Sequence, residues 1–216
     1  SGVPAANLTG AYLWYSDLTN AVLVGANMVN ASLVDSILYD ASLHMTNLSG
    51  ANLQKADLRA VDGHYTDLSG ANLILADLSN CVLFYPNLSN ADLSMSSVIH
   101  VWIFRGNMNN ADLRGAELLG AYLSEANLSG AVLSYTDLTD SYLFHADLSG
   151  VMLAYANLSG AMLAYANLSS ATLGNADFKF ADFTGADLEG ATWYWTYWHQ
   201  TRWSDGNLYD TIQGSG

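Results

Sequence analysis

The sequence predicts an all-β solenoid in which the chain turns four corners in every coil of 20 residues. Three observations lead to this fold. The first is a five-residue period: from Leu8 to Trp193, every fifth position except Gly63 carries a large apolar residue, which is Leu at 30 of 38 positions. The second is a small residue, usually Ala, two positions before each of these central residues. The third is a ten-residue alternation in the flanking residues.

The spacing of the small and central residues predicts short extended segments separated by corners. Side chains two apart on an extended segment point the same way, so the small residue and the Leu both face inward. Three residues separate each Leu from the next small residue, and this odd step requires a corner. A helix is excluded because a five-residue period at 100° per residue would distribute the Leu side chains around every face.

The flanking residues indicate how many corners close one coil. The residue before the central position is Asp or Asn at 16 of 19 positions whose number ends in 7, but at 6 of 19 whose number ends in 2. Gly, Asn and Asp likewise favour corner positions whose number ends in 0. A ten-residue alternation cannot stay in register with a 15-residue triangular coil, but it fits a four-sided coil with two kinds of corner. We expect Gly and Asn at one kind to supply the positive φ of tight turns.

The repeating unit Ala-Asn-Leu-Ser-Gly, seen at residues 126–130 and 156–160, resembles the motif of the pentapeptide repeat proteins. The resemblance covers about nine-tenths of the chain. It implies a right-handed quadrilateral β-helix of about nine to ten 20-residue coils, roughly 45 Å long at about 4.8 Å per coil. We expect this β-helix over residues 1–193 and an aromatic-rich C-terminal cap over residues 194–216.

Composition excludes several classes of function. The chain carries 6 Lys and Arg against 20 Asp and Glu, a net charge of -14, so direct binding to nucleic acid or to an anionic membrane surface is not expected. No apolar run reaches the length of a membrane-spanning helix. Cys81 alone cannot form a disulfide framework or a cysteine-ligated zinc site. We expect no catalysis, cofactor or small-molecule substrate, because no set of Ser, His and Asp has a defensible geometry and the carboxylates lie on flat faces.

Residues 20 apart lie on neighbouring coils of one face, so each face can be read from the sequence. The face that contains Leu23 and Leu43 carries a contiguous apolar patch, which we name the apolar face, at Val82, Phe84, Trp102, Phe104, Tyr122, Tyr142, Phe144 and Met162. Such a patch is typical of a surface for a protein partner or a second copy of the chain. The alternative is that stacked aromatic residues simply favour β-rungs.

A second candidate surface is the aromatic C-terminus. We expect its tryptophans to cover the last coil and its unpaired edge. They could also dock a second copy, as terminal contacts do in several relatives. These residues are Trp193, Trp195, Trp198 and Trp203.

The face that contains Leu18 and Leu58 carries an acidic stripe at Asp17, Asp57, Asp77, Glu117, Asp137 and Asp177. We interpret these residues as the ordinary motif residue, which also supplies solubility. The alternative, suggested by relatives that bind type II topoisomerases, is that the acidic stripe imitates a nucleic-acid backbone and inhibits or protects such an enzyme. A third interpretation is an ordered-water surface formed by the Asn, Asp and Ser rows beside Leu48, Leu68 and Leu128.

The remaining irregularities lie around Gly63, the one central position without a side chain. We expect a local departure from the regular coil here, with Val61, His64 or Tyr65 filling the space. His44 and His64 occupy neighbouring coils with Asp62 nearby, and imidazoles at this spacing could bind a metal ion, although we expect none. The function that the sequence favours is a non-catalytic rigid scaffold that binds a protein partner or itself.

Overall fold

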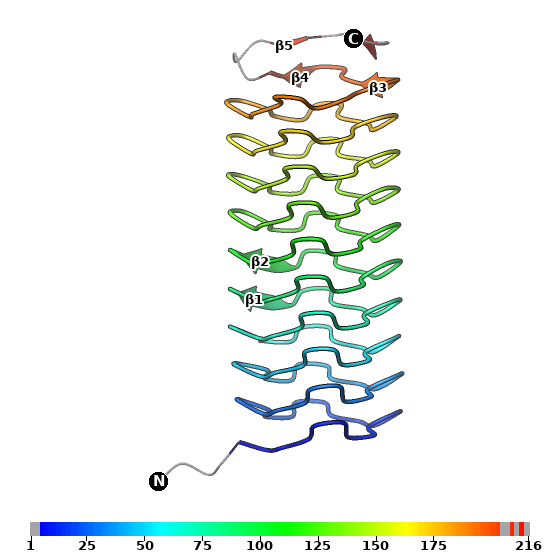
Figure 1. Cartoon of the computed structure of the whole chain (residues 1–216), viewed down its shortest axis with the longest axis vertical. Coiled ribbons are helices and arrows are strands. Elements are labelled where there is room, and N and C mark those ends of the chain that lie inside the picture. The colour runs from blue at the N-terminus through cyan, green and yellow to red at the C-terminus, as the bar shows by residue number, and fades with distance from the viewer. Residues whose placement is uncertain (1–4, 204–207, 210–211, 214–216) are drawn as a thin grey trace.

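The computed structural model describes residues 5–203, 208–209 and 212–213, and in it the chain winds into a long tube (Figure 1). Parallel bridges join residues 20 apart, beginning with Asn7 to Asn27, Tyr12 to Ser32, Asp17 to Ile37 and Val22 to Ser42. Each coil therefore presents four walls. We number them in chain order by their first central residue, so that wall 1 begins at Leu8, wall 2 at Leu13, wall 3 at Leu18 and wall 4 at Leu23.

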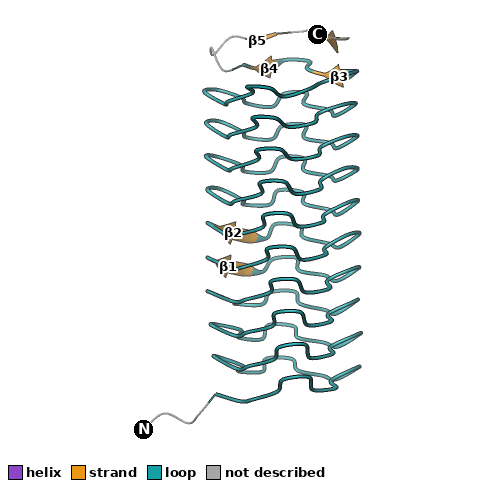
Figure 2. Cartoon of the chain, in the orientation of Figure 1, coloured by secondary structure: helices purple, strands orange, loops and turns teal. Residues whose placement is uncertain are grey.

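Regular strands are short, because a wall segment usually makes only one bridge to each neighbour (Figure 2). Strands β1 (Val82–Phe84) and β2 (Trp102–Phe104) pair in parallel on wall 4. Near the C-terminus lie β3 (Thr196–Tyr197), β4 (Thr201–Arg202), β5 (Leu208–Tyr209) and β6 (Ile212–Gln213). No helix occurs among the described residues, so none there could span a membrane.

The core is a continuous column inside the tube. The central Leu128 and the small residue Ala126 of one quintet are both almost fully buried. Hydrogen bonds between coils run along the tube: Leu8 N–H donates to Asn27 O at 2.6 Å, and Asn27 N–H donates to Ala6 O at 2.8 Å. Burial of the central and small residues therefore leaves the outward side chains on each wall free for other roles.

All the corners have positive φ, at every fifth residue from Gly10 to Gln200, which differs from our expectation of one kind only. Ala131 N–H donates to Leu128 O at 3.0 Å, and Gly130 between them has φ of 66°, as in a type II turn. Large residues such as Tyr135 (φ 63°) adopt the same conformation. The reason is that closure of the coil requires the same turn at each corner, even where a side chain makes it costly.

An Asp or Asn that precedes a central residue usually has a structural task. Its side-chain oxygen accepts a hydrogen bond from the backbone N–H two residues on, as Asp17 does from Thr19 at 3.0 Å. On wall 1 the amides also form a ladder between coils, where Asn87 Nδ2 donates to Asp67 Oδ1 at 3.1 Å. The motif residue thus stabilises the wall locally.

The space beside Gly63 is filled from two directions. A Cβ placed on Gly63 would lie 2.7 Å from both Leu83 Cδ2 and Thr66 Oγ1, and 3.6 Å from Val61 Cγ1. The Thr66 hydroxyl is 2.8 Å from Gly63 O. His64 and Tyr65 do not fill the space, since His64 is half-buried and Tyr65 is exposed on the outside.

The chain reverses direction at the C-terminal end. Strand β3 pairs antiparallel with β6, and β4 pairs antiparallel with β5. On their other edges, β3 and β4 continue the parallel ladder through Asp177–Tyr197 and Asp182–Arg202. The last coil on walls 3 and 4 is therefore covered along both of its edges.

Candidate interaction surface

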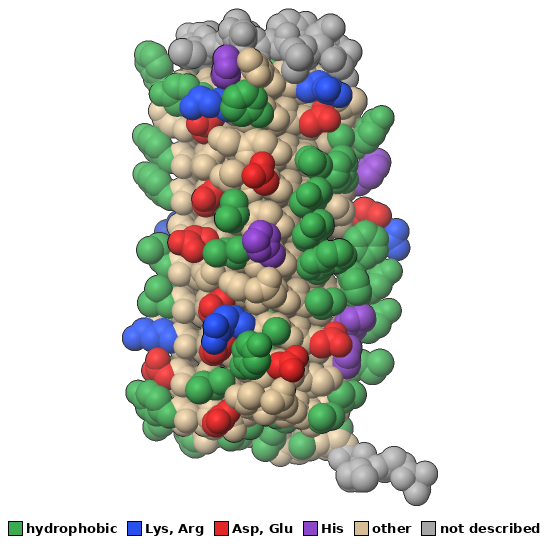
Figure 3. All heavy atoms as spheres, turned by 180° about the vertical axis from the view of Figure 1, so that it is seen from behind, with side chains coloured by type: hydrophobic (Ala, Val, Ile, Leu, Met, Phe, Trp, Pro, Cys, Tyr) green, Lys and Arg blue, Asp and Glu red, His purple; other side chains and the backbone are tan. Residues whose placement is uncertain are grey.

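The structure places the residues of the apolar face on wall 4 in two outward columns. Parallel pairing runs from Val82 to Trp102 and on through Tyr122 and Tyr142 to Met162. The second column follows the central residues and holds Phe84, Phe104 and Phe144 in register. Figure 3, drawn from behind, shows hydrophobic side chains gathered in runs along the length of the tube.

Ring stacking gives the first column its geometry. The rings of Trp102 and Tyr122 lie 4.4 Å apart at 28°, while Phe84 and Phe104 make an edge-on contact at 6.2 Å. Each ring shields its neighbour, so most of these side chains are half-buried, whereas Trp102 keeps 45% and Met162 keeps 37% of its surface exposed. The apolar face thus offers ring edges and one exposed indole to an incoming molecule.

A hollow of about 210 Å³ opens between the two columns, lined by Phe84, Trp102, Phe104, Tyr122 and Ser124. Its cause is Ser124, a small residue in a column that otherwise carries Phe before and after it. Sequence reasoning missed this residue, although the order Phe, Phe, Ser, Phe at 20-residue spacing could have revealed the gap. The hollow has the size and lining to receive one large apolar side chain.

The corner beside the apolar face carries an ion pair. Arg105 Nε donates to Glu125 Oε2 at 2.7 Å, and this contact raises the pKa of the Arg105 guanidinium. The same guanidinium lies 5.0 Å from the centre of the Phe104 ring. Asp62 and Asp182 occupy wall 4 beyond the two ends of the patch, so the surroundings of the apolar face are acidic.

The C-terminal tryptophans divide into a core group and one exposed residue. Trp198 is buried between Phe178, whose ring centre is 4.7 Å away, and Trp203, at 4.6 Å. Trp193 is half-buried against Trp198 at 6.4 Å. Trp195 is 67% exposed, so among the four it has the side chain available to a partner.

The acidic stripe forms a column on wall 3, but the column is interrupted and partly neutralised. Three of its positions carry no carboxylate, because they are occupied by Ile37, Ser97 and Asn157. Arg59 lies 2.7 Å from the Asp57 carboxylate and 3.7 Å from that of Asp77.

These contacts alter the charge that the stripe presents. The hydrogen bond from Arg59 holds the pKa of the Asp57 carboxyl below its usual value, and the Lys179 ammonium pairs with Asp177 at 2.9 Å. The carboxylates also hold backbone N–H groups, as Asp57 does for Arg59 and Asp137 for Thr139. The stripe therefore has a structural explanation that needs no nucleic-acid mimicry.

A tube of four walls, in which a five-residue repeat places Leu and Ala inside and a tight turn at each corner, defines a class of β-helix. The family model for pentapeptide repeats matches the chain in 8 copies, over residues 5–38, 28–62, 41–80, 64–96, 107–143, 141–179 and 163–192. The chain belongs to the pentapeptide repeat family, whose fold is a right-handed β-helix.

Solved structures of this family resemble the chain. HetL from the cyanobacterium Nostoc sp. strain PCC 7120, described as involved in heterocyst differentiation regulation, is 31% identical with a TM-score of 0.55, and the match covers 95% of this chain and 92% of HetL. Trypsin-treated QnrB1, a plasmid-mediated fluoroquinolone resistance protein, is 24% identical with a TM-score of 0.41, over 80% of this chain and 89% of that one. No curated protein sequence matches the chain.

Proposed function

We propose that the protein is a non-catalytic, rigid scaffold that binds a protein partner, or a second copy of itself, through the apolar face. The observation that carries this proposal is the outward column of Trp102, Tyr122 and Tyr142 with the adjacent hollow at Ser124. Aromatic anchors grouped around a small pocket are typical of the energetic centre of protein interfaces.

Comparison of the walls supports this interpretation. Wall 1 occupies the equivalent outward column with amides and carboxylates that bond to one another, so the fold does not require aromatic residues there. The aromatic column on wall 4 is thus an addition to a wall that can be built without it.

The charge of the molecule defines the chemistry of the proposed partner. The net charge is -14, and Asp62 and Asp182 lie on wall 4 beyond the two ends of the apolar face. The proposed partner presents an apolar side chain for the hollow and basic residues around it. The opposite charges would attract it to the surface, and the apolar contact in the hollow would hold it there. HetL is described as involved in regulation, and we propose a comparable role through contact rather than catalysis for this chain.

We also propose the finer organisation of the tube. A β-helix of about nine to ten coils over residues 1–193 ends in an aromatic-rich cap over residues 194–216. Burial of Trp198 supports the cap, as does the antiparallel pairing of β3 with β6 and of β4 with β5. The exposed Trp195 is the residue through which this end would contact a second copy.

Mimicry of nucleic acid by the acidic stripe is the alternative function, and the ion pairs of Arg59 and Lys179 weigh against it. A supercoiling assay with a bacterial type II topoisomerase separates the two. Inhibition or protection of the topoisomerase at micromolar concentrations, lost in Asp57→Asn/Asp77→Asn, would contradict our proposal and support the mimic. The absence of any effect on the topoisomerase would exclude the mimic.

The experiment that tests the scaffold function compares binding by the wild type and by Trp102→Ser/Tyr122→Ser. Self-association is measured by sedimentation equilibrium, and partner capture by affinity purification with quantitative mass spectrometry. Asn107→Ser/Asn127→Ser on wall 1 is the matched control. We expect an interaction that the wall 4 variant loses and the control keeps. If the wild type neither self-associates nor captures any protein in a wall 4-dependent way, the proposal is wrong.

A further inference from the structure

Asp62 departs from the hydrogen bonding of every other Asp or Asn that precedes a central residue in the described chain. All the others accept a hydrogen bond from the backbone N–H two residues on. At Asp62 that N–H belongs to His64, and it donates instead to His44 Nδ1 at 3.2 Å. The Asp62 carboxylate is thereby released from its usual structural task.

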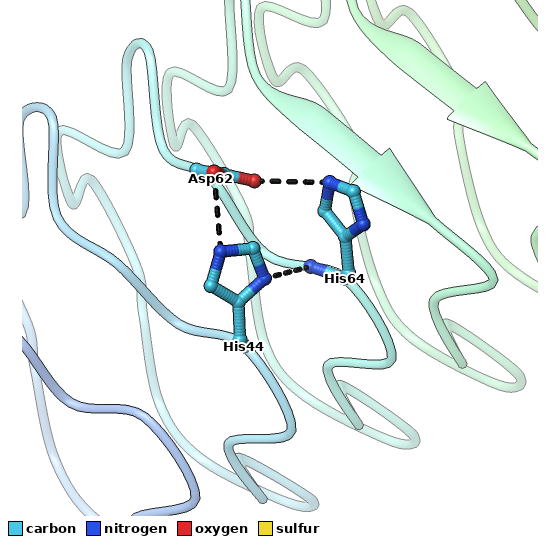
Figure 4. Close-up of side chains that lie close together, drawn as sticks. All are labelled: His44, Asp62 and His64. Atoms are coloured by element: carbon cyan, nitrogen blue, oxygen red, sulfur yellow. Dashed lines mark hydrogen bonds and ion pairs between the residues drawn. The ribbon is translucent and has the colours of Figure 1, made fainter.

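The released carboxylate points toward two imidazole rings on neighbouring coils (Figure 4). Its Oδ2 lies 3.1 Å from His44 Nε2, and its Oδ1 lies 3.2 Å from His64 Nε2. The two rings are 4.8 Å apart at an angle of 67°. One residue therefore presents each of its oxygens to a different histidine, while His64 also contacts the ring of Phe84 at 4.7 Å.

Asp182 shows what the same position on wall 4 does without histidines. Its Oδ1 accepts the backbone N–H of Thr184 at 2.9 Å, as the motif requires. The departure at Asp62 thus coincides with the pair of imidazoles and with Gly63, rather than with wall 4 as a whole. The carboxylate without its backbone hydrogen bond and the paired rings therefore lie at one place.

These three side chains have the chemistry of a metal site. The ligand atoms of His44, Asp62 and His64 all lie within 4.8 Å of one another. Imidazole nitrogens and a carboxylate oxygen are ligands for Zn²⁺ and related first-row ions, at about 2.0–2.2 Å. The side chains are 31%, 53% and 34% exposed in that order, so an ion can enter from solvent and keep water on its remaining positions.

We propose that His44, Asp62 and His64 bind one divalent first-row transition-metal ion, for which Zn²⁺ is the reference. Binding draws both Nε2 atoms and a carboxylate oxygen onto the ion, and each imidazole then carries its proton on Nδ1. His44 gives up the hydrogen bond from the His64 N–H in this step, because a protonated Nδ1 cannot accept it, and solvent water takes up any second proton that an imidazole carries. The bound ion joins two coils of wall 4 and lies beside the apolar face through Phe84.

Calorimetric titration with ZnCl₂ tests the proposal on the full chain without a histidine tag. We expect one Zn²⁺ per chain, an affinity at least about tenfold weaker in both Asp62→Asn and His64→Gln, and an unchanged affinity in His145→Gln. Both site variants keep hydrogen-bonding side chains, and their circular dichroism and metal-free thermal midpoint verify that they fold. Zn²⁺ should raise the thermal midpoint of the wild type more than it raises those of the two site variants.

Two results would overturn the proposal. One is the absence of binding at about 100 μM Zn²⁺, a concentration well above the dissociation constants of structural zinc sites. The other is binding that the Asp62→Asn and His64→Gln variants retain at wild-type strength, since this would place the ion on other surface groups. The visible spectrum of the Co²⁺ complex supplies a second readout, because it changes with the number of nitrogen ligands and should differ between the wild type and His64→Gln.

Discussion

The phenol rings of Tyr122 and Tyr142 lie 4.4 Å apart and within 3° of parallel on neighbouring coils of wall 4. Trp102 extends the same stack on the other side of Tyr122. Tyr122 is therefore held between two aromatic rings while its edge faces outward, which makes it both a surface residue and a stabilising one. Stability and binding can be separated at this residue by experiment.

Removal of Tyr122 should destabilise the tube. Tyr122→Ala loses two ring stacks, and we expect the free energy of unfolding to fall by about 1–3 kcal/mol, since an aromatic pair contributes roughly 0.5–1.5 kcal/mol. Chemical denaturation measures the change. Ser124→Ala is the control, and its effect should stay within about 0.5 kcal/mol. Equal effects of the two substitutions would show that the stack contributes nothing.

Lys55→Gly should stabilise the protein. Lys55 has φ of 58°, a conformation that costs a residue with a Cβ about 1–2 kcal/mol and costs glycine little. After the greater chain entropy of glycine is subtracted, we expect a gain of up to about 1 kcal/mol in chemical denaturation. Lys55→Ala keeps the Cβ and should show no gain, so a gain in both variants would contradict the explanation.

Core truncation should cost more in the middle of the tube than at its start. Leu128 is fully buried, so Leu128→Ala should lower the free energy of unfolding by about 2–5 kcal/mol. Leu8 is only partly buried in the first coil, and Leu8→Ala should cost less than about 2 kcal/mol. Denaturation of both variants checks the prediction, and equal costs would mean that burial does not decide the result.

The ion pair of Asp57 and Arg59 should stabilise the fold at neutral pH and lose this effect in acid. The hydrogen bond from Arg59 lowers the pKa of Asp57 in the folded state, so its contribution is complete above the ordinary value near 3.9 and disappears as the pH falls through the folded value. Because the Arg59 side chain is 49% exposed, solvent screens the pair and we expect its contribution to be small.

The free energy of unfolding of the wild type and of Arg59→Gln, measured at several pH values, gives the contribution of this ion pair. The difference between the two proteins should be largest near pH 7 and should vanish below the folded pKa of Asp57. A difference that grows as the pH falls would contradict the assigned cause. Lys55→Gln removes a positive charge without an ion pair and serves as the control.

Cys81 should be unreactive in the folded protein. Its thiol is buried and donates to Leu58 O at 2.9 Å, and burial raises its pKa to about 12. At pH 8 the thiolate fraction is roughly a thousandfold smaller than for an ordinary cysteine. Reaction with a disulfide reagent should be slow in buffer and fast in denaturant. Rapid native labelling would show that this coil opens readily.

Much of the fold follows from the spacing of residues such as Leu8 and Leu128. A five-residue period leaves no regular helix or flat strand that could bury every Leu, and the ten-residue alternation then makes residues 20 apart neighbours. The positions of Trp102, Tyr122 and Tyr142 in one column could be predicted for this reason. Their ring angles could not, because they depend on the contacts between side chains.

Other features depend on contacts that spacing does not report. Leu83, from the next coil, occupies the space beside Gly63, and the position of a neighbouring side chain cannot be read from the period. Tyr135 adopts positive φ because the coil must close, although residue type alone disfavours it. The His64 N–H donates to His44 Nδ1 rather than to Asp62, and only the local geometry decides between these two acceptors.

The direction of the hydrogen bonds between coils has a mechanical consequence. Bonds such as that from Leu8 N–H to Asn27 O join one coil to the next, so they point along the tube. Tension applied between the two ends loads these bonds one coil at a time rather than all together. The protein should lengthen under force in steps of 20 residues, each releasing about 65–70 Å of chain. A force applied across the tube is carried by the covalent bonds of the backbone instead. The molecule should therefore resist widening and extend more readily along its length.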